Sequence, residues 1–168
     1  QGVYPEIINV GGGLGVDYQA PHEHPIPDFQ GYFAVFKDCL QLRDGQSLHF
    51  ELGRSIVAQC GSLMTRVLYV KQSGDKHFAI VDAGMTELIR PALYGAYHHI
   101  ENLTSTAEKR QKYDVVGPIC ESSDIFAADL PLPTTQRGDI LAIRSAGAYG
   151  ESMASCYNCR QLPSSYTD

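Results

Sequence analysis

Residues 62–85, SLMTRVLYVKQSGDKHFAIVDAGM, predict two β-strands joined by a Ser-Gly-Asp turn. The segments KYDVVGPICES, residues 112–122, and RGDILAIRSAGAYG, residues 137–150, each predict one further strand. Glycine and proline residues separate these segments, as is typical of the turns between neighbouring strands. This part of the chain is therefore predicted to be mostly antiparallel β-structure.

Two segments of the same part do not follow the strand pattern. TELIRPALYGAYHHIENL, residues 86–103, predicts a short helical turn around Pro91. ENLTSTAEKRQK, residues 101–112, is polar and has no periodicity, which predicts a solvated loop. Neither an internal repeat nor a low-complexity tract is found in the sequence.

The part of the chain before residue 57 has a different composition. EIINVGGGLG, residues 6–15, predicts a short buried strand over Ile7–Val10 that stops at three glycines. Residues 20–27 are rich in proline and polar residues and predict a loop, and Asp28 then caps a helix that ends near Leu42. The apolar residues of this helix recur at helical spacing: Phe29, Tyr32, Phe33, Phe36 and Leu40.

A second strand is predicted after this helix, in SLHFELG, residues 47–53. Leu48, Phe50 and Leu52 alternate with polar residues, and Gly53 closes the strand. The order strand, helix, strand is that of a piece of a parallel α/β fold, in which functional residues gather at the carboxyl ends of the strands. Both the triple glycine and the ELGR motif follow such ends.

Composition excludes several classes of function. The chain has 168 residues, a formal net charge of −6 and a pI of about 5.4, without a run of Lys or Arg. We therefore expect no nucleic-acid partner, because such partners require a basic surface. No window approaches the ~20 apolar residues of a membrane span. Five cysteines, an odd number, fit reduced thiols better than a disulfide framework and indicate the cytoplasm.

Five phrases occur in an order that resembles the diaminopimelate decarboxylases, a family of pyridoxal-phosphate enzymes with the alanine-racemase-like fold that also includes ornithine decarboxylase. The resemblance covers nearly the whole chain, and the ordered set is far more specific than any one phrase. The phrases are NVGGGLG (9–15), FELGRSIVAQCG (50–61), FAIVDAGMTELIRPALYGAYH (78–98), DVVGPICESSD (114–124) and AGAYGESMASCYN (146–158).

The resemblance implies an α+β fold that is mainly β. Residues 1–56 would be the last strand-helix-strand of an incomplete (β/α)8 barrel, and residues 57–168 a C-terminal antiparallel β-barrel or sandwich domain. The barrel lysine that holds the cofactor covalently would lie before Gln1. The chain would then be a C-terminal fragment that is inactive alone, from an enzyme that converts meso-diaminopimelate to L-lysine and CO2.

The resemblance also assigns residues that bind pyridoxal 5'-phosphate. Glu51 would pair with the pyridine nitrogen and keep it protonated, so that the ring can accept electrons. Leu52 stands where the family commonly has proline. The phosphate would be bound by the glycine turn and by groups from three other positions: Gly11, Gly12, Gly13, Gly53, Arg54 and Tyr149. From the residues alone, a lone triple glycine is more often simply a tight turn, and Tyr149 could equally be a core tyrosine.

Substrate-binding residues follow from the same resemblance. Arg54, Arg90 and Tyr94 would bind substrate carboxylates, and Tyr149 would lie at the phosphate or the substrate beside it. Cys120 would be the catalytic proton donor and Glu121 would bind the distal ammonium, both in the site of the neighbouring subunit of a homodimer. A thiol with an ordinary pKa near 8.5 is protonated at pH 7 and can still give up its proton.

Without the resemblance, each of these residues has a simpler interpretation. An isolated arginine is usually a solvated surface charge, and a cysteine beside a glutamate is usually a buried thiol beside a surface carboxylate. Cys156 and Cys159 have redox or half-zinc spacing, but no second ligand pair supports a site. The pairs His22 and His24, and His98 and His99, are predicted to be surface histidines, so no metal site is expected.

Two alternatives stay open at this level. One is a decarboxylase of the same family that acts on ornithine, arginine or carboxynorspermidine. Glu121 together with Arg90 and Tyr94 favours a substrate that carries both a distal amine and a distal carboxylate. The other alternative is a non-catalytic homologous β module that binds a protein partner.

Overall fold

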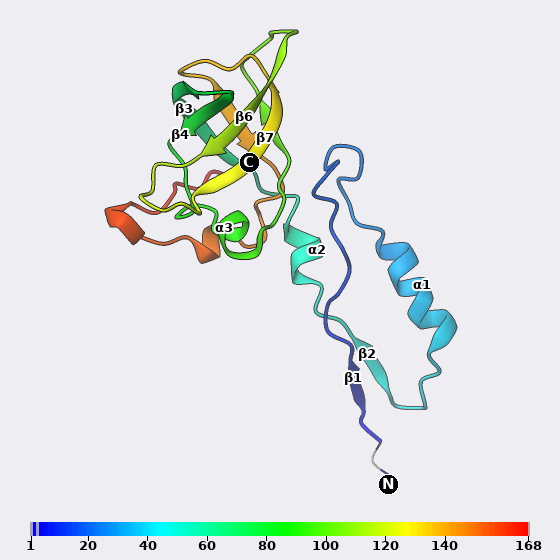
Figure 1. Cartoon of the computed structure of the whole chain (residues 1–168). Helices are drawn as coiled ribbons and strands as arrows, with labels where there is room; N and C mark the ends of the chain where they lie inside the picture. The colour runs from blue at the N-terminus through cyan, green and yellow to red at the C-terminus, as the bar shows by residue number, and fades with distance from the viewer. Residues whose placement is uncertain (1, 3, 168) are drawn as a thin grey trace.

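The computed structural model describes residues 2 and 4–167, and it contains two separate sheets (Figure 1). A two-stranded sheet and one helix form the N-terminal part, and a six-stranded sheet forms the rest. The elements are β1 (Ile7–Asn9), α1 (Phe29–Cys39), β2 (Ser47–His49), α2 (Gly53–Val57), β3 (Leu63–Ser73), β4 (Lys76–Val81), α3 (Arg90–Tyr94), β5 (Ile100–Asn102), β6 (Arg110–Val116), β7 (Ile125–Pro133), β8 (Ile140–Ile143) and two 3-10 turns, Glu151–Met153 and Tyr157–Cys159.

The six-stranded sheet has the order β5-β8-β3-β4-β6-β7, and it confirms the predicted mainly β fold. The hairpin of β3 and β4 turns at Gly74, as the sequence predicts, and every pairing is antiparallel except that of β4 with β6. The side chains that face its interior are fully buried, since their removal from water is the main stabilising contribution. They include Val67, Val81, Val115, Leu141 and Ile143.

Three parts of the sheet differ from the sequence expectation. The last two residues of β5 and the first three of β6 lie in residues 101–112, which were predicted to be a loop. Ile100, at the start of β5, is buried and pairs with β8, and Arg110 pairs with Pro133 of β7. β7 itself was not expected, since it contains Pro131 and Pro133. It is an edge strand that pairs only with β6, a position where proline is tolerated.

The N-terminal part confirms the predicted strand-helix-strand order. β1 and β2 pair in parallel, and the side chain of Asp28 caps α1 by accepting from the Gly31 N–H at 2.8 Å. The helix ends at Cys39, close to the predicted end. β2 stops at His49, so Gly53 does not close the strand but begins α2.

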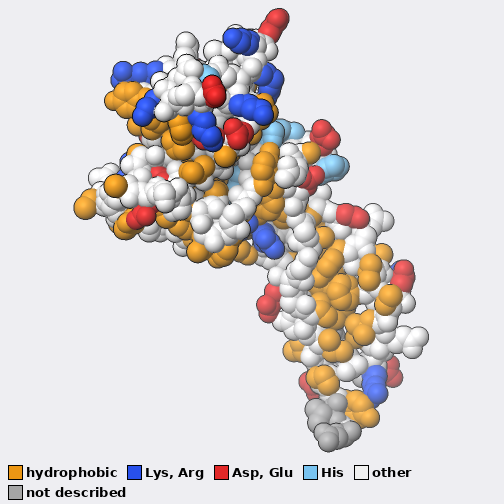
Figure 2. Space-filling model, in the orientation of Figure 1, with side chains coloured by type: hydrophobic (Ala, Val, Ile, Leu, Met, Phe, Trp, Pro, Cys, Tyr) orange, Lys and Arg blue, Asp and Glu red, His pale blue; other side chains and the backbone are white. Residues whose placement is uncertain are grey.

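The expectation that the first strand is buried is wrong. Ile7 is 55% exposed, and α1 has no buried residue. Within the described residues, α1 is the one helix that covers the two-stranded sheet. It does so through edge-to-face aromatic contacts between Tyr32, Phe36 and Phe50. Figure 2 shows the apolar side chains that this single layer leaves at the surface of the N-terminal part.

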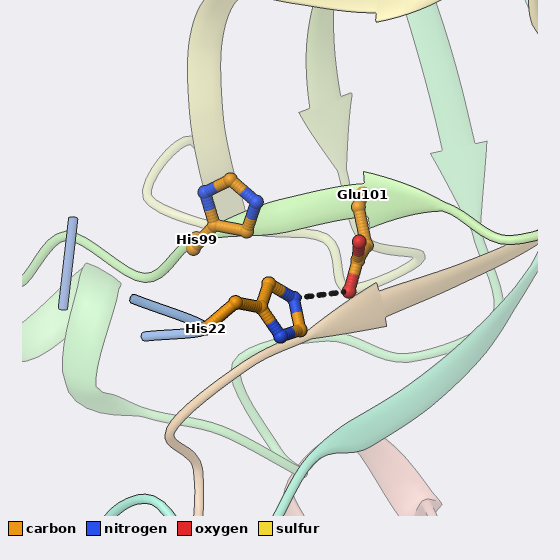
Figure 3. A group of neighbouring side chains, drawn as sticks. All are labelled: His22, His99 and Glu101. Carbon is orange, nitrogen blue, oxygen red and sulfur yellow. Dashed lines mark hydrogen bonds and ion pairs between the residues drawn. The ribbon is translucent and has the colours of Figure 1, made fainter. Parts of the chain in front are cut away.

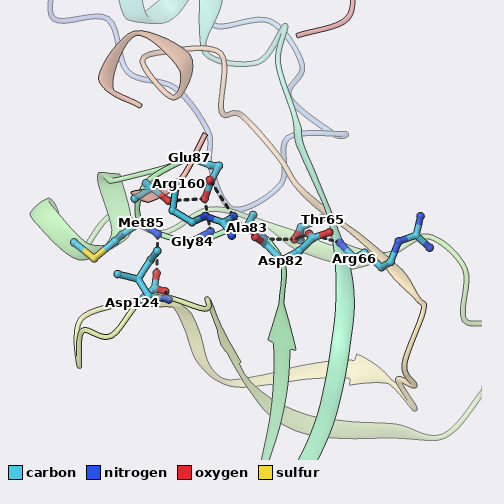
Figure 4. Close-up of polar contacts among 11 residues, drawn as sticks. Thr65, Arg66, Asp82, Ala83, Gly84, Met85, Glu87, Asp124 and Arg160 are labelled. Atoms are coloured by element: carbon cyan, nitrogen blue, oxygen red, sulfur yellow. Dashed lines mark hydrogen bonds and ion pairs between the residues drawn. The ribbon is translucent and has the colours of Figure 1, made fainter. Parts of the chain in front are cut away.

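Two carboxylates, the partly buried Asp82 and the buried Glu87, hold the loop that follows β4 (Figure 4). Asp82 accepts from the Thr65 hydroxyl at 2.7 Å and from the Arg66 N–H at 2.8 Å, which fixes the end of β4 to β3. Glu87 accepts from the Gly84 N–H at 2.7 Å. Arg160 from the C-terminal segment donates to Glu87 at 3.1 Å, so this segment is anchored to the same loop.

None of the helices within residues 2 and 4–167 combines the length and the apolar character needed to cross a membrane.

Asp114 of β6 connects this strand to both of its neighbours in the sheet, β4 and β7. Its carboxylate accepts from the Lys76 ammonium on β4 at 2.8 Å and from the Asp129 N–H on β7 at 2.8 Å. The hydrogen bond from Lys76, followed by that from Asp129, lowers the pKa of Asp114 below its ordinary value. Its ionised form is therefore favoured in the folded state.

We predict that the free energy of unfolding falls less steeply with decreasing pH in Asp114→Asn than in the wild type. Because the folded-state pKa lies below the unfolded value of about 3.9, the carboxylate stabilises the fold above that pH and loses this effect as the pH falls through the folded pKa. Urea unfolding between pH 6 and pH 2.5 measures the slope. Asp44→Asn changes an exposed turn carboxylate and serves as the control. Equal acid slopes for the two variants would contradict the prediction.

Candidate functional site

The glycine turn after β1 is bonded to the backbone that follows β2. The Glu51 N–H donates to the Gly11 carbonyl at 2.8 Å, which continues the parallel pairing beyond both strands. A Cβ at Gly12 would lie 2.9 Å from the Glu51 carbonyl oxygen, and Gly13 has φ +109°, so both positions need glycine. The turn therefore presents backbone without side chains beside Glu51.

Asn9 orients the Glu51 carboxylate, a role that sequence reasoning missed. Its Nδ2 donates to Glu51 Oε1 at 2.7 Å, and its Oδ1 accepts from the Gly11 N–H at 2.8 Å. Tyr32 of α1 was also missed, and its hydroxyl donates to the Gly12 carbonyl at 2.8 Å. An asparagine at the last position of a strand, two residues before the first glycine of the turn, was the available signal for the first of these residues.

A cavity of about 160 Å³ opens beside this turn. It brings together five residues that were predicted to bind the cofactor, and Gly11 and Gly53 flank them in the chain. Leu52 contributes to the wall. The lining residues are Gly12, Gly13, Leu14, Glu51, Leu52, Arg54, Ser55 and Tyr149.

Tyr149 comes to this cavity from the opposite end of the sequence. The Gly147 N–H donates to the Ala58 carbonyl at 3.0 Å, and the Ala146 N–H donates to the Gly61 carbonyl at 2.8 Å. A Cβ at Gly147 would lie 1.9 Å from the Val57 carbonyl oxygen, so only glycine permits this approach. The backbone contact thus fixes Tyr149 beside the end of the small sheet.

The polar groups of the cavity suit a ligand with an anionic part and a cationic part. The bare backbone of Gly12 and Gly13, the Arg54 guanidinium and the Tyr149 hydroxyl can hydrogen-bond to phosphate oxygens. Glu51, held by Asn9, can accept a hydrogen bond from a protonated ring nitrogen. These residues therefore fit pyridoxal phosphate, which carries both groups.

Arg90 and Tyr94 lie together on α3, outside the lining of this cavity. The Arg90 guanidinium carbon is 5.8 Å from the Tyr94 ring centre and 5.4 Å from that of Tyr18. Arg90 is only 8% exposed, and its Nε has no acceptor among the described residues. A buried guanidinium with a free donor suits a carboxylate ligand.

His98, next to Arg90, is not the surface histidine that the sequence predicts. It is 1% exposed and packs edge-on against Tyr18, with ring centres 5.1 Å apart, and its Nδ1 donates to the Arg144 carbonyl at 2.9 Å. Burial, reinforced by the charge of Arg90, lowers the pKa of His98. The prediction fails because His98 lies two residues before β5, whose pairing with β8 the sequence did not indicate.

Cys120 and Glu121 lie on a closed loop between β6 and β7, and both are exposed. Asp124 closes the loop: its buried carboxylate accepts from the Ile119 N–H at 2.7 Å and from the Met85 N–H at 2.6 Å. Burial raises the pKa of Asp124. Glu121 accepts a hydrogen bond from the Tyr157 hydroxyl, a contact that sequence reasoning did not foresee.

The chain does not bring Cys120 or Glu121 into the lining of the cavity that holds Glu51. Cys156 and Cys159 are exposed free thiols. A larger cavity, about 600 Å³, lies between β3, the end of β4 and residues 160–166. It contains none of the predicted binding residues, so the smaller cavity is the candidate site.

Comparison with known proteins adds independent information. The family model described as "Pyridoxal-dependent decarboxylase, C-terminal sheet domain" matches residues 16–147. A diaminopimelate decarboxylase from Bacteroides thetaiotaomicron is 63% identical over 96% of this chain and 42% of its own length. The enzyme from Aquifex aeolicus is 45% identical over 92% of the chain and 36% of its own length. The chain thus spans about two fifths of the length of these relatives.

Solved structures agree with this result. A point mutant of diaminopimelate decarboxylase from Helicobacter pylori, complexed with L-lysine, superposes with a TM-score of 0.81 at 44% identity and covers 92% of this chain and 37% of its own. A lysine/ornithine decarboxylase from Vibrio vulnificus, complexed with cadaverine, has a TM-score of 0.78 at 22% identity, covering 90% of this chain and 40% of its own. The second structure shares the fold, and its low identity supports nothing further.

We predict that Gly147→Ala destabilises the chain by about 2 kcal/mol or more, because the new Cβ must displace the backbone at Val57. Urea unfolding measures the loss. Gly15→Ala is the matched control, since a Cβ at Gly15 meets no atom within 4 Å. A stability of Gly147→Ala equal to that of the control would show that the close backbone approach is not required.

Asp124→Ala should also destabilise the chain, by about 1–3 kcal/mol for each of the two amides left without an acceptor. We further expect faster proteolysis within residues 117–124, because the substitution releases this loop. Ser122→Ala, an exposed position in the same loop, should change stability by less than about 0.5 kcal/mol. Unchanged proteolysis of Asp124→Ala would contradict the assigned role.

Proposed function

Because this chain belongs to the pyridoxal-dependent decarboxylase family, we propose that it forms part of a diaminopimelate decarboxylase, which converts meso-diaminopimelate to L-lysine and CO2. The observation that carries the proposal is the cavity in which the glycine turn, Glu51, Arg54 and Tyr149 meet. The 63% identity to the Bacteroides enzyme supports the choice of substrate.

Pyridoxal phosphate, when bound, supplies an electron-withdrawing ring that stabilises the electron pair left by the departing CO2. Glu51 would keep the ring nitrogen protonated, and Asn9 would hold the carboxylate in place through its bond at 2.7 Å. The backbone of the glycine turn, together with Arg54 and Tyr149, would bind the phosphate. In this scheme the chain contributes the orientation and the electrostatics of the cofactor.

Substrate recognition would depend on groups of both charges. Arg90, whose buried Nε has no acceptor within residues 2 and 4–167, would bind the distal carboxylate, and Tyr94 would contribute beside it. Arg54 would bind a substrate carboxylate near the cofactor. Glu121 would bind the distal ammonium, and Cys120 would donate the proton to the reacting carbon.

Cys120 and Glu121 would act in the site of a second copy of the protein. Both are exposed on the loop that Asp124 holds, and neither lines the cavity of its own chain, which supports a site completed across a homodimer. Five free cysteines fit the reducing cytoplasm as the place of action. The bound partners would be an amino acid and a second subunit, with nucleic acid excluded by charge.

The domain boundary between residues 56 and 57 stays a prediction. It falls within α2, between the two-stranded and the six-stranded sheet.

The substrate is tested with the polypeptide of full family length that carries this chain. We expect CO2 release from meso-diaminopimelate and none from ornithine, arginine or carboxynorspermidine. Turnover of ornithine without turnover of diaminopimelate would assign the rival substrate. Binding to a protein without any turnover would favour the non-catalytic module.

The role of Glu51 is tested in the same polypeptide. Glu51→Gln should lower kcat by at least about 100-fold, since it removes the charge that keeps the ring protonated. Glu108→Gln, an exposed control, should retain full activity.

The shared site is tested by mixing Glu51→Gln and Cys120→Ser subunits, each inactive alone. Random pairing of two-fold dimers should restore about one quarter of the wild-type activity, because half of the dimers contain one intact site. Failure to restore activity, with hybrid dimers demonstrated by tagged subunits, would place Cys120 in its own subunit's site.

A further inference from the structure

Three side chains that commonly bind metals meet outside the cofactor cavity: His22, His99 and Glu101 (Figure 3). One ligand atom from each lies within 4.8 Å of the corresponding atoms of the other two. The sequence alone predicts surface histidines at both positions, and the proposed decarboxylase function uses none of the three residues. Their convergence depends on two segments that are almost eighty positions apart in the chain.

Strand alternation places two of the ligands on one face. Ile100, the first residue of β5, is 3% exposed and points into the core of the sheet. His99 and Glu101 flank it and therefore project from the opposite face, because successive side chains of a strand alternate. The Arg144 N–H donates to the His99 carbonyl at 2.8 Å, which fixes the backbone that carries both ligands.

The third ligand comes from the loop before α1. The N–H groups of Glu23 and His24 both donate to the Ala20 carbonyl at 3.0 Å, so His22 lies within a defined turn. The Gln59 side chain donates to the His24 carbonyl at 2.6 Å and ties this turn to the segment between α2 and β3. His22 Nε2 lies 3.1 Å from Glu101 Oε1, and its ring lies edge-on to that of His99.

Glu101 is held in place by hydrogen bonds from the side chains of Arg144 and His22. Arg144 Nε pairs with Oε1, the oxygen that His22 also contacts. A carboxylate with such a partner has the character of metal-ligating carboxylates, which are commonly oriented by an outer hydrogen bond.

We propose that His22, His99 and Glu101 bind a divalent transition-metal ion, with zinc as the best match, and that water completes the coordination. Two imidazoles and one carboxylate are an established zinc ligand set, with bonds of about 2.0–2.2 Å. Such bonds bring tetrahedral ligands to roughly 3.4 Å of one another, so the cluster must contract slightly. The 58% exposed His22 side chain has the freedom to do so.

The consequence of binding is a clamp between two parts of the chain. The ion would connect the turn at residues 20–24 to β5, where His22 and Glu101 now share a single hydrogen bond. Because a ligand that binds only the folded state adds to its stability, zinc should raise the melting temperature. This inference is independent of the decarboxylase assignment and of bound cofactor.

The test is a zinc titration of the cofactor-free chain in competition with a chromophoric chelator. The five exposed cysteines are first alkylated, because free thiolates also bind zinc. We expect one ion per chain, and His22→Gln and His99→Gln should each weaken binding at least about tenfold. His24→Gln removes a histidine of the same turn that is not in the cluster, and it should bind zinc like the wild type.

Thermal unfolding with and without zinc provides the second measurement. Zinc should raise the melting temperature of the alkylated wild type and of His24→Gln, and should leave that of His22→Gln unchanged. His22 is exposed, so its variant should keep the zinc-free stability of the wild type and remain informative if His99→Gln unfolds. Absence of saturable binding, or wild-type binding by His22→Gln, would overturn the proposal.

Discussion

The close approach of the Gly147 backbone to the end of α2 is the constraint on which the rest of this structure depends. The absence of a side chain at this position lets the segment after β8 contact Val57 and Ala58 directly. Through this contact, Tyr149 from the six-stranded part lies over Gly53 at the end of the two-stranded part. The candidate site therefore exists only where the two sheets are joined.

Carboxylates provide the remaining rigidity around the site. The buried Glu87 and Asp124 accept backbone N–H groups of the loops after β4 and β6, and Asp82 accepts from the Arg66 N–H of β3. Leaving such groups buried and unpaired is costly, so these carboxylates define the loop conformations. The loop that presents Cys120 is consequently ordered even though the thiol itself is exposed.

The site residues fall into three groups within one chain. Glu51 and its neighbours line the cavity, Arg90 lies buried on α3, and Cys120 is exposed on a separate loop. The residues proposed to bind the cofactor come from the end of β1, from the backbone after β2, and from Tyr149, which the Gly147 contact brings from the other part of the chain. Arg90 and Cys120, which are proposed to act on the substrate, come from the six-stranded part, and the proposed sharing of the site between two copies would account for their separation within one chain.

In the amino-acid sequence, the order of five motifs indicates the family, and local patterns of turn residues, alternation and capping specify the β3–β4 hairpin and the Asp28 cap. Three features followed only from the folded chain: Asn9 orients Glu51, His98 is buried, and His22 meets Glu101. These contacts join residues that are distant in the sequence, and no local pattern encodes the path that brings them together. Residue type shows what a group can do, and the packing of the whole chain determines what it contacts.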